Sequence, residues 1–295
     1  MIPSLRTTAR LTLAVGLGKS PVCTLRQVLH SSVVSQRIDH LTRSLLSSAE
    51  VVDTSAECSL WRTRLGEFWF PTNGAIEQLA NCLAEQDIGV YSSSLTRSRR
   101  GDVVLDCGAN VGTFSHKACG LGAAQVVAIE PASRNLDCLR RNLDRNIASR
   151  QVVLETRGLW DKEETLVLNM DKGNPLKHRV VADRGASLLT QICVTTIDNI
   201  VSELRLDRVN FIKMDVEGAE LKALSGGRNT IRTHRPLLAI AVEHGKDLIA
   251  NAKAVIQLVR DIHPAYEWDC PYCEELPGGL IFPEVLTFYD PVTLS

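Results

Sequence analysis

The sequence lacks several features that would settle its class at once. None of its apolar runs is long enough to cross a bilayer, so we expect no membrane span. Its formal net charge is −1, which argues against a broad nucleic-acid footprint. It has no internal repeat. Its nine cysteines follow no regular spacing, which favours a reducing compartment over a secreted disulfide scaffold.

Acidic residues are also missing from the first 38 positions, which carry scattered Arg and Lys among Ser, Thr and Leu. This composition is typical of a mitochondrial or plastid transit peptide. The alternative is a disordered basic tail on a cytoplasmic protein. We therefore divide the chain into a targeting or disordered leader (1–38), a helical lead-in (39–98) and a larger domain (99–295).

What the chain does contain is an alternation of strand and helix patterns. Within the lead-in we expect a loop as far as Pro71 and a helix over 74–87. Beyond it, short apolar runs that stop at Gly or Pro alternate with amphipathic segments. Buried strands are expected near 102–107, 125–130, 151–156, 191–195, 209–215 and 236–243, with two more near 265–269 and 280–288. This pattern predicts an α/β fold with a doubly wound, mostly parallel sheet.

The alternation breaks between 161 and 195. The segment TLVLNM predicts an extra strand, and the long polar insertion DKGNPLKHRVVADRGAS follows it. The insertion has five basic residues, namely Lys172, Lys177, His178, Arg179 and Arg184. They support either a solvated loop or an RNA-binding surface.

The stretch DVVLDCGANVGTF, residues 102–114, predicts a strand followed directly by a helix. Such a turn exposes backbone N–H groups, and Gly108 and Gly112 let a ligand approach the main chain. A dinucleotide fold would need glycine where Asn110 stands, and Asp106 would repel a pyrophosphate. S-Adenosylmethionine is a cation and suits both residues. Glu130 ends the next strand, where a carboxylate can accept the ribose hydroxyls.

Several ordered blocks, from VVLDCGANVGTF through AIEPASRNLDCLRRNL, VTTIDNIV and IKMDVEGAELKAL to LLAIAVEH, resemble the FkbM family of S-adenosylmethionine-dependent methyltransferases. The resemblance runs from about Gly66 to Leu286. It implies a class I methyltransferase (Rossmann-like) fold, a seven-stranded sheet whose last strand is antiparallel. It also implies O-methylation of a hydroxyl on a small molecule or sugar.

The resemblance also implies which residues bind the cofactor. Asp106, Gly108, Asn110 and Gly112 would line the methionine end, and Ala109 and Asp215 would also contact the cofactor. Glu130 would hold the ribose, and Gly158 and Leu159 would lie beside the adenine.

Acidic and histidine side chains end two later strands. Asp215 follows the strand near 209–215, and Glu243 and His244 follow the strand near 236–243, so we expect these residues to converge near the transferred methyl group. His244 has a suitable unperturbed pKa for a base, and Asp215 is the alternative base. Asp215 and Glu243 could hold a divalent cation, although two carboxylates make an incomplete site. Glu217, two residues after Asp215, is a further catalytic candidate. Asp215 and Glu217 could instead cap the following helix.

Two further readings remain open. Tyr91 could close over the cofactor or serve only in packing. The CPYC motif, Cys270 to Cys273, supplies only two metal donors, with His263 the nearest further candidate along the sequence, so a reduced structural pair is expected. An RNA or protein methyltransferase and a non-catalytic binding module are the alternative functions.

Overall fold

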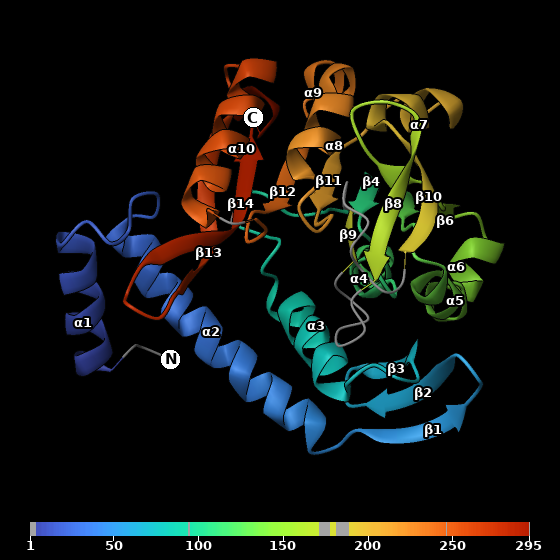
Figure 1. Cartoon of the computed structure of the whole chain (residues 1–295), viewed down its shortest axis with the longest axis horizontal. Helices are drawn as coiled ribbons and strands as arrows, with labels where there is room; N and C mark the ends of the chain where they lie inside the picture. The colour runs from blue at the N-terminus through green and yellow to red at the C-terminus, as the bar shows by residue number, and fades with distance from the viewer. Residues whose placement is uncertain (1–3, 94, 171–177, 181–188, 246, 295) are drawn as a thin grey trace.

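The computed structural model describes residues 4–93, 95–170, 178–180, 189–245 and 247–294. Its centre is a seven-stranded sheet of order β13-β14-β12-β11-β4-β5-β6 (Figure 1). The strands are β4 (Val103–Cys107), β5 (Gln125–Ile129), β6 (Val152–Glu155), β11 (Phe211–Met214), β12 (Leu237–Ala241), β13 (Glu267–Glu275) and β14 (Ile281–Tyr289). Five strands run parallel, namely β6, β5, β4, β11 and β12. Strand β14 is antiparallel to both of its neighbours, β12 and β13. The predicted doubly wound sheet with an antiparallel last strand is confirmed.

Helices cover both faces of this sheet, which explains why its parallel strands are mostly apolar. Successive residues of β4 enter different cores: Val104 packs on one face and Leu105 on the other. One face is covered by α7 (Ile197–Glu203), α8 (Glu220–Gly226), α9 (Arg228–His234) and α10 (Leu248–Ile262). The other is covered by α3 (Ile76–Ile88), α4 (Thr113–Gly120), α5 (Ser133–Asn142) and α6 (Asp144–Ala148). The predicted helix at 74–87 corresponds to α3.

The segment before α3 differs from the sequence prediction. Instead of a loop or helix it forms an antiparallel sheet of β1 (Glu50–Thr54), β2 (Cys58–Thr63) and β3 (Gly66–Pro71). In β3, Phe68 and Phe70 are buried, while the Arg141 guanidinium carbon lies 4.4 Å from the ring centroid of Trp69. The run EFWF therefore alternates between a core face and a covered outer face, which is the pattern of a strand.

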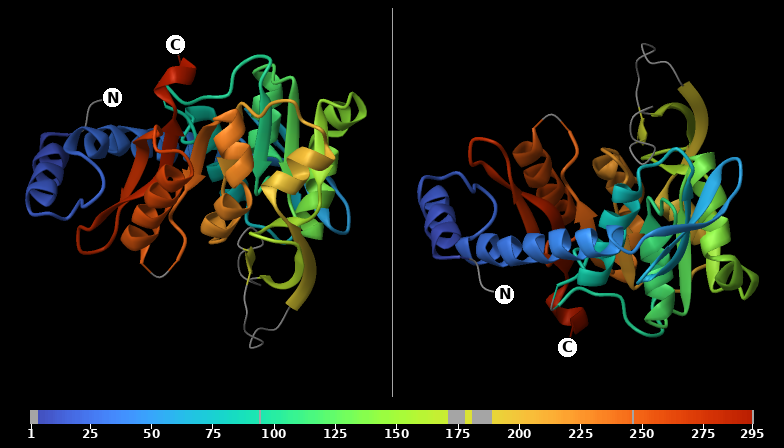
Figure 2. Two further views of the ribbon diagram at one scale, coloured as in Figure 1. Left: turned by 90° about the horizontal axis from the view of Figure 1, so that it is seen from above. Right: turned by 90° about the horizontal axis from the view of Figure 1, so that it is seen from below.

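The leader is helical where the structure describes it. Helices α1 (Leu5–Gly16) and α2 (Leu25–Leu46) bury apolar side chains, among them Leu11, Val28 and Ile38. Figure 2 shows α2 as a long helix that runs along one side of the molecule. The structure thus differs from the disordered alternative for this segment, whereas targeting stays a prediction. Among the described residues, no helix combines the length and apolarity that spanning a membrane requires.

A second, four-stranded sheet interrupts the alternation. It has the order β7-β10-β8-β9, with β7 (Gly158–Leu159), β8 (Glu164–Met170), β9 (His178–Val180) and β10 (Leu189–Thr195). The extra strand predicted at TLVLNM is β8. The strand expected to resume the main sheet at 191–195 is β10, which instead pairs with β7 and β8. Most of the polar insertion, including Lys172, Lys177 and Arg184, lies outside the described residues.

Candidate active site

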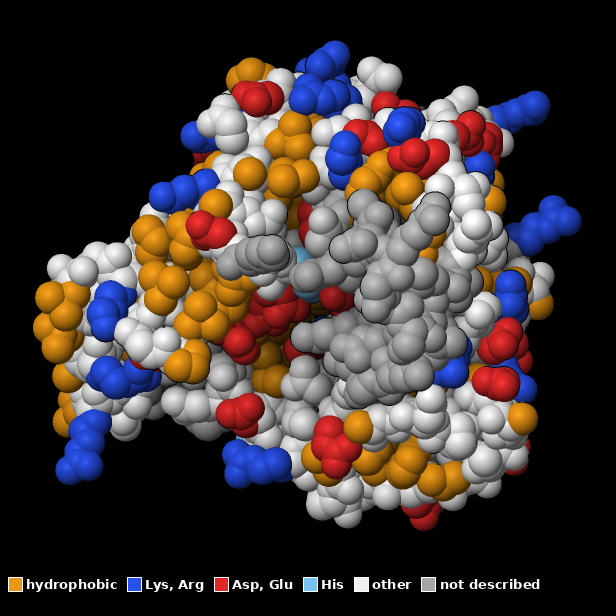
Figure 3. All heavy atoms as spheres, in the orientation of Figure 1, with side chains coloured by type: hydrophobic (Ala, Val, Ile, Leu, Met, Phe, Trp, Pro, Cys, Tyr) orange, Lys and Arg blue, Asp and Glu red, His pale blue; other side chains and the backbone are white. Residues whose placement is uncertain are grey.

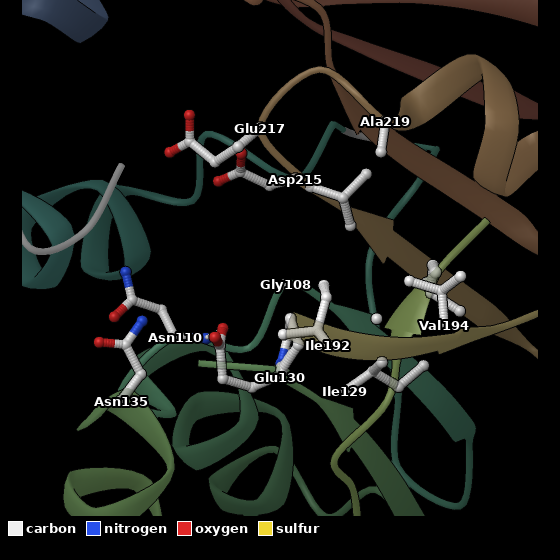
Figure 4. Close-up of a pocket in the computed structure, with 14 residues that line it drawn as sticks. Gly108, Asn110, Ile129, Glu130, Asn135, Ile192, Val194, Asp215, Glu217 and Ala219 are labelled. Atoms are coloured by element: carbon white, nitrogen blue, oxygen red, sulfur yellow. Dashed lines mark hydrogen bonds between the residues drawn. The ribbon is translucent and has the colours of Figure 1, made fainter. Parts of the chain in front are cut away.

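A cavity opens at the carboxyl ends of β4, β5 and β11, with β7 and β10 along one side. Figure 4 shows that its polar side chains gather at one end and its apolar side chains at the other. This is the edge of an open α/β sheet where ligands bind. The lining residues are Gly108, Asn110, Ile129, Glu130, Pro131, Asn135, Gly158, Leu159, Ile192, Val194, Asp215, Val216, Glu217 and Ala219.

Gly108 lets the ends of β4 and β11 approach each other. Its φ is +79°, and a Cβ there would lie 1.8 Å from the backbone oxygen of Asp215. Only glycine avoids both the strain and this clash. The buried Lys213 ammonium donates to the Gly108 carbonyl at 2.7 Å, which holds the turn from below.

Asp106, predicted to face the cofactor, lies beneath the turn and does not line the cavity. It is fully buried, accepts a 2.6 Å hydrogen bond from Ser115 Oγ and lies 3.3 Å from Lys213 Nζ. Burial alone would lower the pKa of Lys213, but the charges of Asp106 and Asp215 raise it above its usual value. Asp106 therefore neutralises the lysine that supports the turn.

Two other predicted turn residues also lie outside the cavity lining. Ala109 is buried. Gly112 has a φ of +87°, and a Cβ at this position would meet the Leu143 side chain at 3.0 Å. These residues shape the turn that presents Gly108 and Asn110 to the cavity.

Glu130 is a buried carboxylate that faces the turn. It accepts backbone N–H groups of Asn110 at 2.9 Å and of Ala132 at 2.8 Å. Burial raises the pKa of Glu130 to about 7, although both hydrogen bonds oppose the shift. Beside it, the buried side-chain oxygens of Asn110 and Asn135 have no hydrogen-bond partner. A polar ligand in the cavity would satisfy them.

The opposite end of the cavity is apolar. Gly158 lies so close to Ile192 and Val194 that a Cβ would meet each side chain at 3.2 Å. Together with Leu159 and Pro131 these residues form a slot for a flat apolar ring. The sequence analysis placed Gly158 and Leu159 here but missed Ile192 and Val194. Their signal was alternation with exposed neighbours, which marks a strand with one covered face.

A carboxylate and histidine cluster occupies the end of β11. Asp215 Oδ2 accepts a 2.9 Å hydrogen bond from the Tyr91 hydroxyl, and Tyr91 is buried outside the cavity lining. His244 Nε2 lies 3.2 Å from Glu217 Oε2 and 3.8 Å from Asp215 Oδ1. Three predicted residues are therefore brought together, with Asp215 and Glu217 lining the cavity and His244 behind them.

Glu220, which the sequence analysis missed, joins this cluster to the turn after β11. One of its oxygens accepts the backbone N–H groups of Val216 and Gly218 and lies 3.0 Å from His244 Nδ1. Helix α8 itself has no side-chain cap from Asp215 or Glu217. The capping alternative for those two residues is therefore not what the structure shows.

The surroundings of His244 make it a cation. Burial opposes its charge, but the hydrogen bonds to Glu217 and Glu220 and the charge of Asp215 outweigh burial and raise the pKa of His244 to about 11. Because both ring nitrogens face carboxylates, both carry protons near neutral pH. His244 thus lacks the free nitrogen that a general base needs.

Glu243, next to His244 in the sequence, has a pKa close to neutral pH. Its Oε1 lies 3.8 Å from His244 Nε2. Burial and the charge of Asp215 raise the pKa of Glu243 to about 7, although His244 opposes the shift. Glu85 on α3 behaves similarly, because burial and the charges of Glu243 and Asp215 raise its pKa to about 8. Figure 3 shows acidic side chains gathered at the centre of this face.

The chain is similar in sequence to known methyltransferases. Residues 106–263 match the family model described as the methyltransferase FkbM domain. The chain is 28% identical over 153 residues to methyltransferase sdnD of Sordaria araneosa, covering 42% of this chain and 59% of that protein. It is 28% identical over 158 residues to the hexuronic acid methyltransferase AglP of Haloferax volcanii, covering 54% of this chain and 62% of that protein.

The matches therefore span about three fifths of each curated relative. Among solved structures, a methyltransferase FkbM from Methylobacillus flagellatus KT superimposes with a TM-score of 0.49 at 21% identity, covering 90% of this chain and 59% of that chain. The family model covers more than half of the 295 residues. This chain belongs to the FkbM methyltransferase domain family.

Proposed function

We propose that the protein transfers a methyl group from S-adenosylmethionine to a hydroxyl group of a sugar or another small molecule. Family membership and the hexuronic acid methyltransferase among its relatives support this proposal. The observation that carries it is a cavity with a buried carboxylate at one strand end, a carboxylate cluster at another and an apolar slot beside them. The bound cofactor would supply an electrophilic methyl group on a sulfonium cation.

The lining residues fit the parts of this cofactor. Leu159, Ile192 and Val194 would pack against the adenine ring. Glu130 would accept the ribose hydroxyls, since its two backbone hydrogen bonds leave part of the carboxylate's acceptor capacity unused. The unpartnered Asn110 oxygen and the Asp215 carboxylate would receive the cationic methionine portion.

Proton removal from the acceptor is assigned to Glu243. Glu243 does not itself line the cavity, but its Oε1 lies 3.8 Å from His244 Nε2, the atom that also faces Asp215 and Glu217 at the cavity. A base works best when its pKa lies near the working pH, and the pKa of Glu243 is about 7. His244 is held as a cation and orients Glu217. Tyr91 fixes the Asp215 carboxylate through the hydrogen bond from its hydroxyl. Asp215 is therefore a group that orients the reactants and sets the pKa of its neighbour.

A divalent cation is not part of this mechanism. The donor atoms of Asp215, Glu217 and His244 lie within 4.8 Å of one another, so a cation could reach all three. It would have to displace the proton that the carboxylates hold on His244 Nε2. We therefore expect that added Mg²⁺ does not increase methyl transfer.

The test is an incubation of the purified protein with cell extract and methyl-labelled cofactor, followed by separation of small molecules, protein and RNA. The proposal expects label in the small-molecule fraction. Label in RNA or protein would favour the alternative enzymes, although the acidic side chains around the site would repel a phosphate backbone. Cofactor binding without label in any fraction would indicate a non-catalytic module.

A further inference from the structure

The CPYC motif gains a third cysteine in the folded protein. Cys23, in the connection between α1 and α2, places its sulfur 3.2 Å from that of Cys270. The sulfurs of Cys23, Cys270 and Cys273 all lie within 4.8 Å of one another, and all three residues are buried. His263, the donor suggested by the sequence, instead lies 2.9 Å from Asp290.

A break in strand β13 makes this convergence possible. In a regular strand, residues three apart face opposite sides of the sheet. The register of β13 against β14 shifts between Asp269 and Tyr272 and again between Tyr272 and Cys273. These irregularities turn the Cys270 and Cys273 side chains to the same side, toward Cys23. Pro271 lies within the break, a position that proline tolerates in a strand.

Hydrogen bonds also hold the connection between α1 and α2, which carries Cys23, against the β13–β14 hairpin. The backbone N–H of Ile281 donates to the Lys19 carbonyl at 2.7 Å, and Lys19 Nζ donates to the Gly278 carbonyl at 2.7 Å. These bonds tie the connection that carries Cys23 to the β13–β14 hairpin. On α2, Ser31 Oγ lies 3.0 Å from the Cys273 N–H and 3.1 Å from its sulfur. The two sulfurs of β13 and the sulfur of Cys23 in the α1–α2 connection are thus held around one point.

We propose that Cys23, Cys270 and Cys273 form a binding site for a thiolate-seeking divalent cation, with Zn²⁺ as the expected ion. Sulfurs bound to one zinc ion at about 2.3 Å lie about 3.8 Å apart in tetrahedral geometry. The observed spacing, 3.2 Å for one pair and within 4.8 Å for all, requires only small side-chain shifts.

Binding forms three zinc–sulfur bonds and releases to solvent the protons that the thiols still hold, without oxidation or reduction. Three protein donors leave one zinc position for water. A cavity between α1, α2 and β13 reaches Cys273 and provides an entry path.

Such a site would join the N-terminal helices to the methyltransferase sheet. Figure 1 shows α1 and the start of α2 beside the β13–β14 hairpin. Cys273 is followed on β13 by Glu274, whose charge raises the pKa of Glu243. The ion would therefore stabilise the edge of the sheet next to the acidic group of the active site.

The test measures zinc per chain in the purified full-length protein by elemental analysis. We expect about one zinc ion per chain in the wild type and in the control Cys193→Ser, whose thiol is exposed and outside the cluster. Cys23→Ser and Cys273→Ser should lower zinc content about tenfold or more, since even outer-shell partners of a metal affect affinity by that much.

A second measurement does not depend on the folding of the variants. Wild-type protein stripped by a chelator and titrated with Co²⁺ should develop a thiolate-to-cobalt charge-transfer band that added Zn²⁺ removes. Wild-type protein that holds no zinc and develops no such band would overturn the proposal. A Cys23–Cys270 disulfide found by mass spectrometry in the intact protein would also overturn it.

Discussion

The Nδ1 atom of His244 lies 3.0 Å from Oε1 of Glu220, a carboxylate that is 1% exposed. On the other side of the ring, Nε2 faces Glu217 at 3.2 Å. A buried ring between two carboxylates keeps both protons, because its deprotonation would leave the negative charges without a partner. His244 is therefore a cation near neutral pH, which is why the proposed proton acceptor is the neighbouring Glu243 carboxylate.

The raised pKa of His244 gives stability a defined pH dependence. Protonation of the folded state contributes stability that is fully present below about pH 6.5 and is lost as the pH rises toward about 11. His244→Gln should lower the free energy of unfolding by about 3 kcal/mol at pH values below about 6.5. The difference from wild type should shrink with rising pH in urea titrations. His40→Gln, on the exposed face of α2, is the matched control. A loss of unfolding free energy in His244→Gln that does not change with pH would contradict this account.

Substitutions at Gly108 and Gly101 distinguish the cost of a strained backbone angle from the cost of a clash between the new side chain and a neighbouring backbone segment. Both have positive φ, +79° and +85°, but only at Gly108 would a Cβ meet another atom, the Asp215 oxygen at 1.8 Å. Gly101→Ala should cost about 1 kcal/mol of stability and leave cofactor affinity unchanged. Gly108→Ala should cost more and abolish binding, measured by thermal unfolding and calorimetry. Equal effects of the two substitutions would show that the turn does not require the close approach.

Methyl transfer should depend on the protonation of Glu243. The wild-type rate should rise with pH to a plateau above about 7. Glu243→Gln should lower the rate about a hundredfold and remove this rise. Asp215→Asn removes a charge that raises the pKa of Glu243, so the rise should move to lower pH. If the rise disappears in Asp215→Asn and persists in Glu243→Gln, Asp215 is the base.

The acid-free leader predicts import into mitochondria or plastids, which a reporter fused behind residues 1–38 would test. Leu11, Cys23 and Val28 pack in the core of the folded chain. We therefore expect that the imported protein retains them, as mass spectrometry of its N-terminus would show. A reporter that stays in the cytosol would refute targeting, and a mature chain that begins near residue 38 would refute retention.

The sequence predicted the central sheet well because its strands are short apolar runs that end at Gly or Pro. Val103–Cys107 and Gln125–Ile129 have that pattern, and both are buried parallel strands. In the missed sheet at 50–71, β1 has no buried residue and so shows no apolar face. The alternation of Phe68 and Phe70 in β3 was visible in the sequence, but this stretch was interpreted as a loop that ends at Pro71. The leader was read from charge alone, and its apolar positions Leu11, Val28 and Ile38 were not weighed.

Within the candidate site, position in the fold was predictable and electrostatic partners were not. The places of Glu130 and Asp215 follow from strand ends, which meet at one edge of the sheet, and the place of Gly158 was implied by the family resemblance. The pairing of Asp106 with Lys213 depends on the register of β4 against β11, where the two residues lie side by side. Likewise, the charge of His244 depends on Glu220, 24 residues earlier on another element. Neither relationship is visible in spacing along the chain.

The most direct test of the central claim, that this cavity holds S-adenosylmethionine, is calorimetric titration with S-adenosylhomocysteine at several pH values. The account predicts binding to the wild type that tightens as the pH rises through about 7, since ionised Glu130 accepts the ribose hydroxyls. Glu130→Gln should weaken binding and remove this dependence, and NAD should bind poorly. Preference for NAD, or affinity that is unchanged in Glu130→Gln, would contradict the claim.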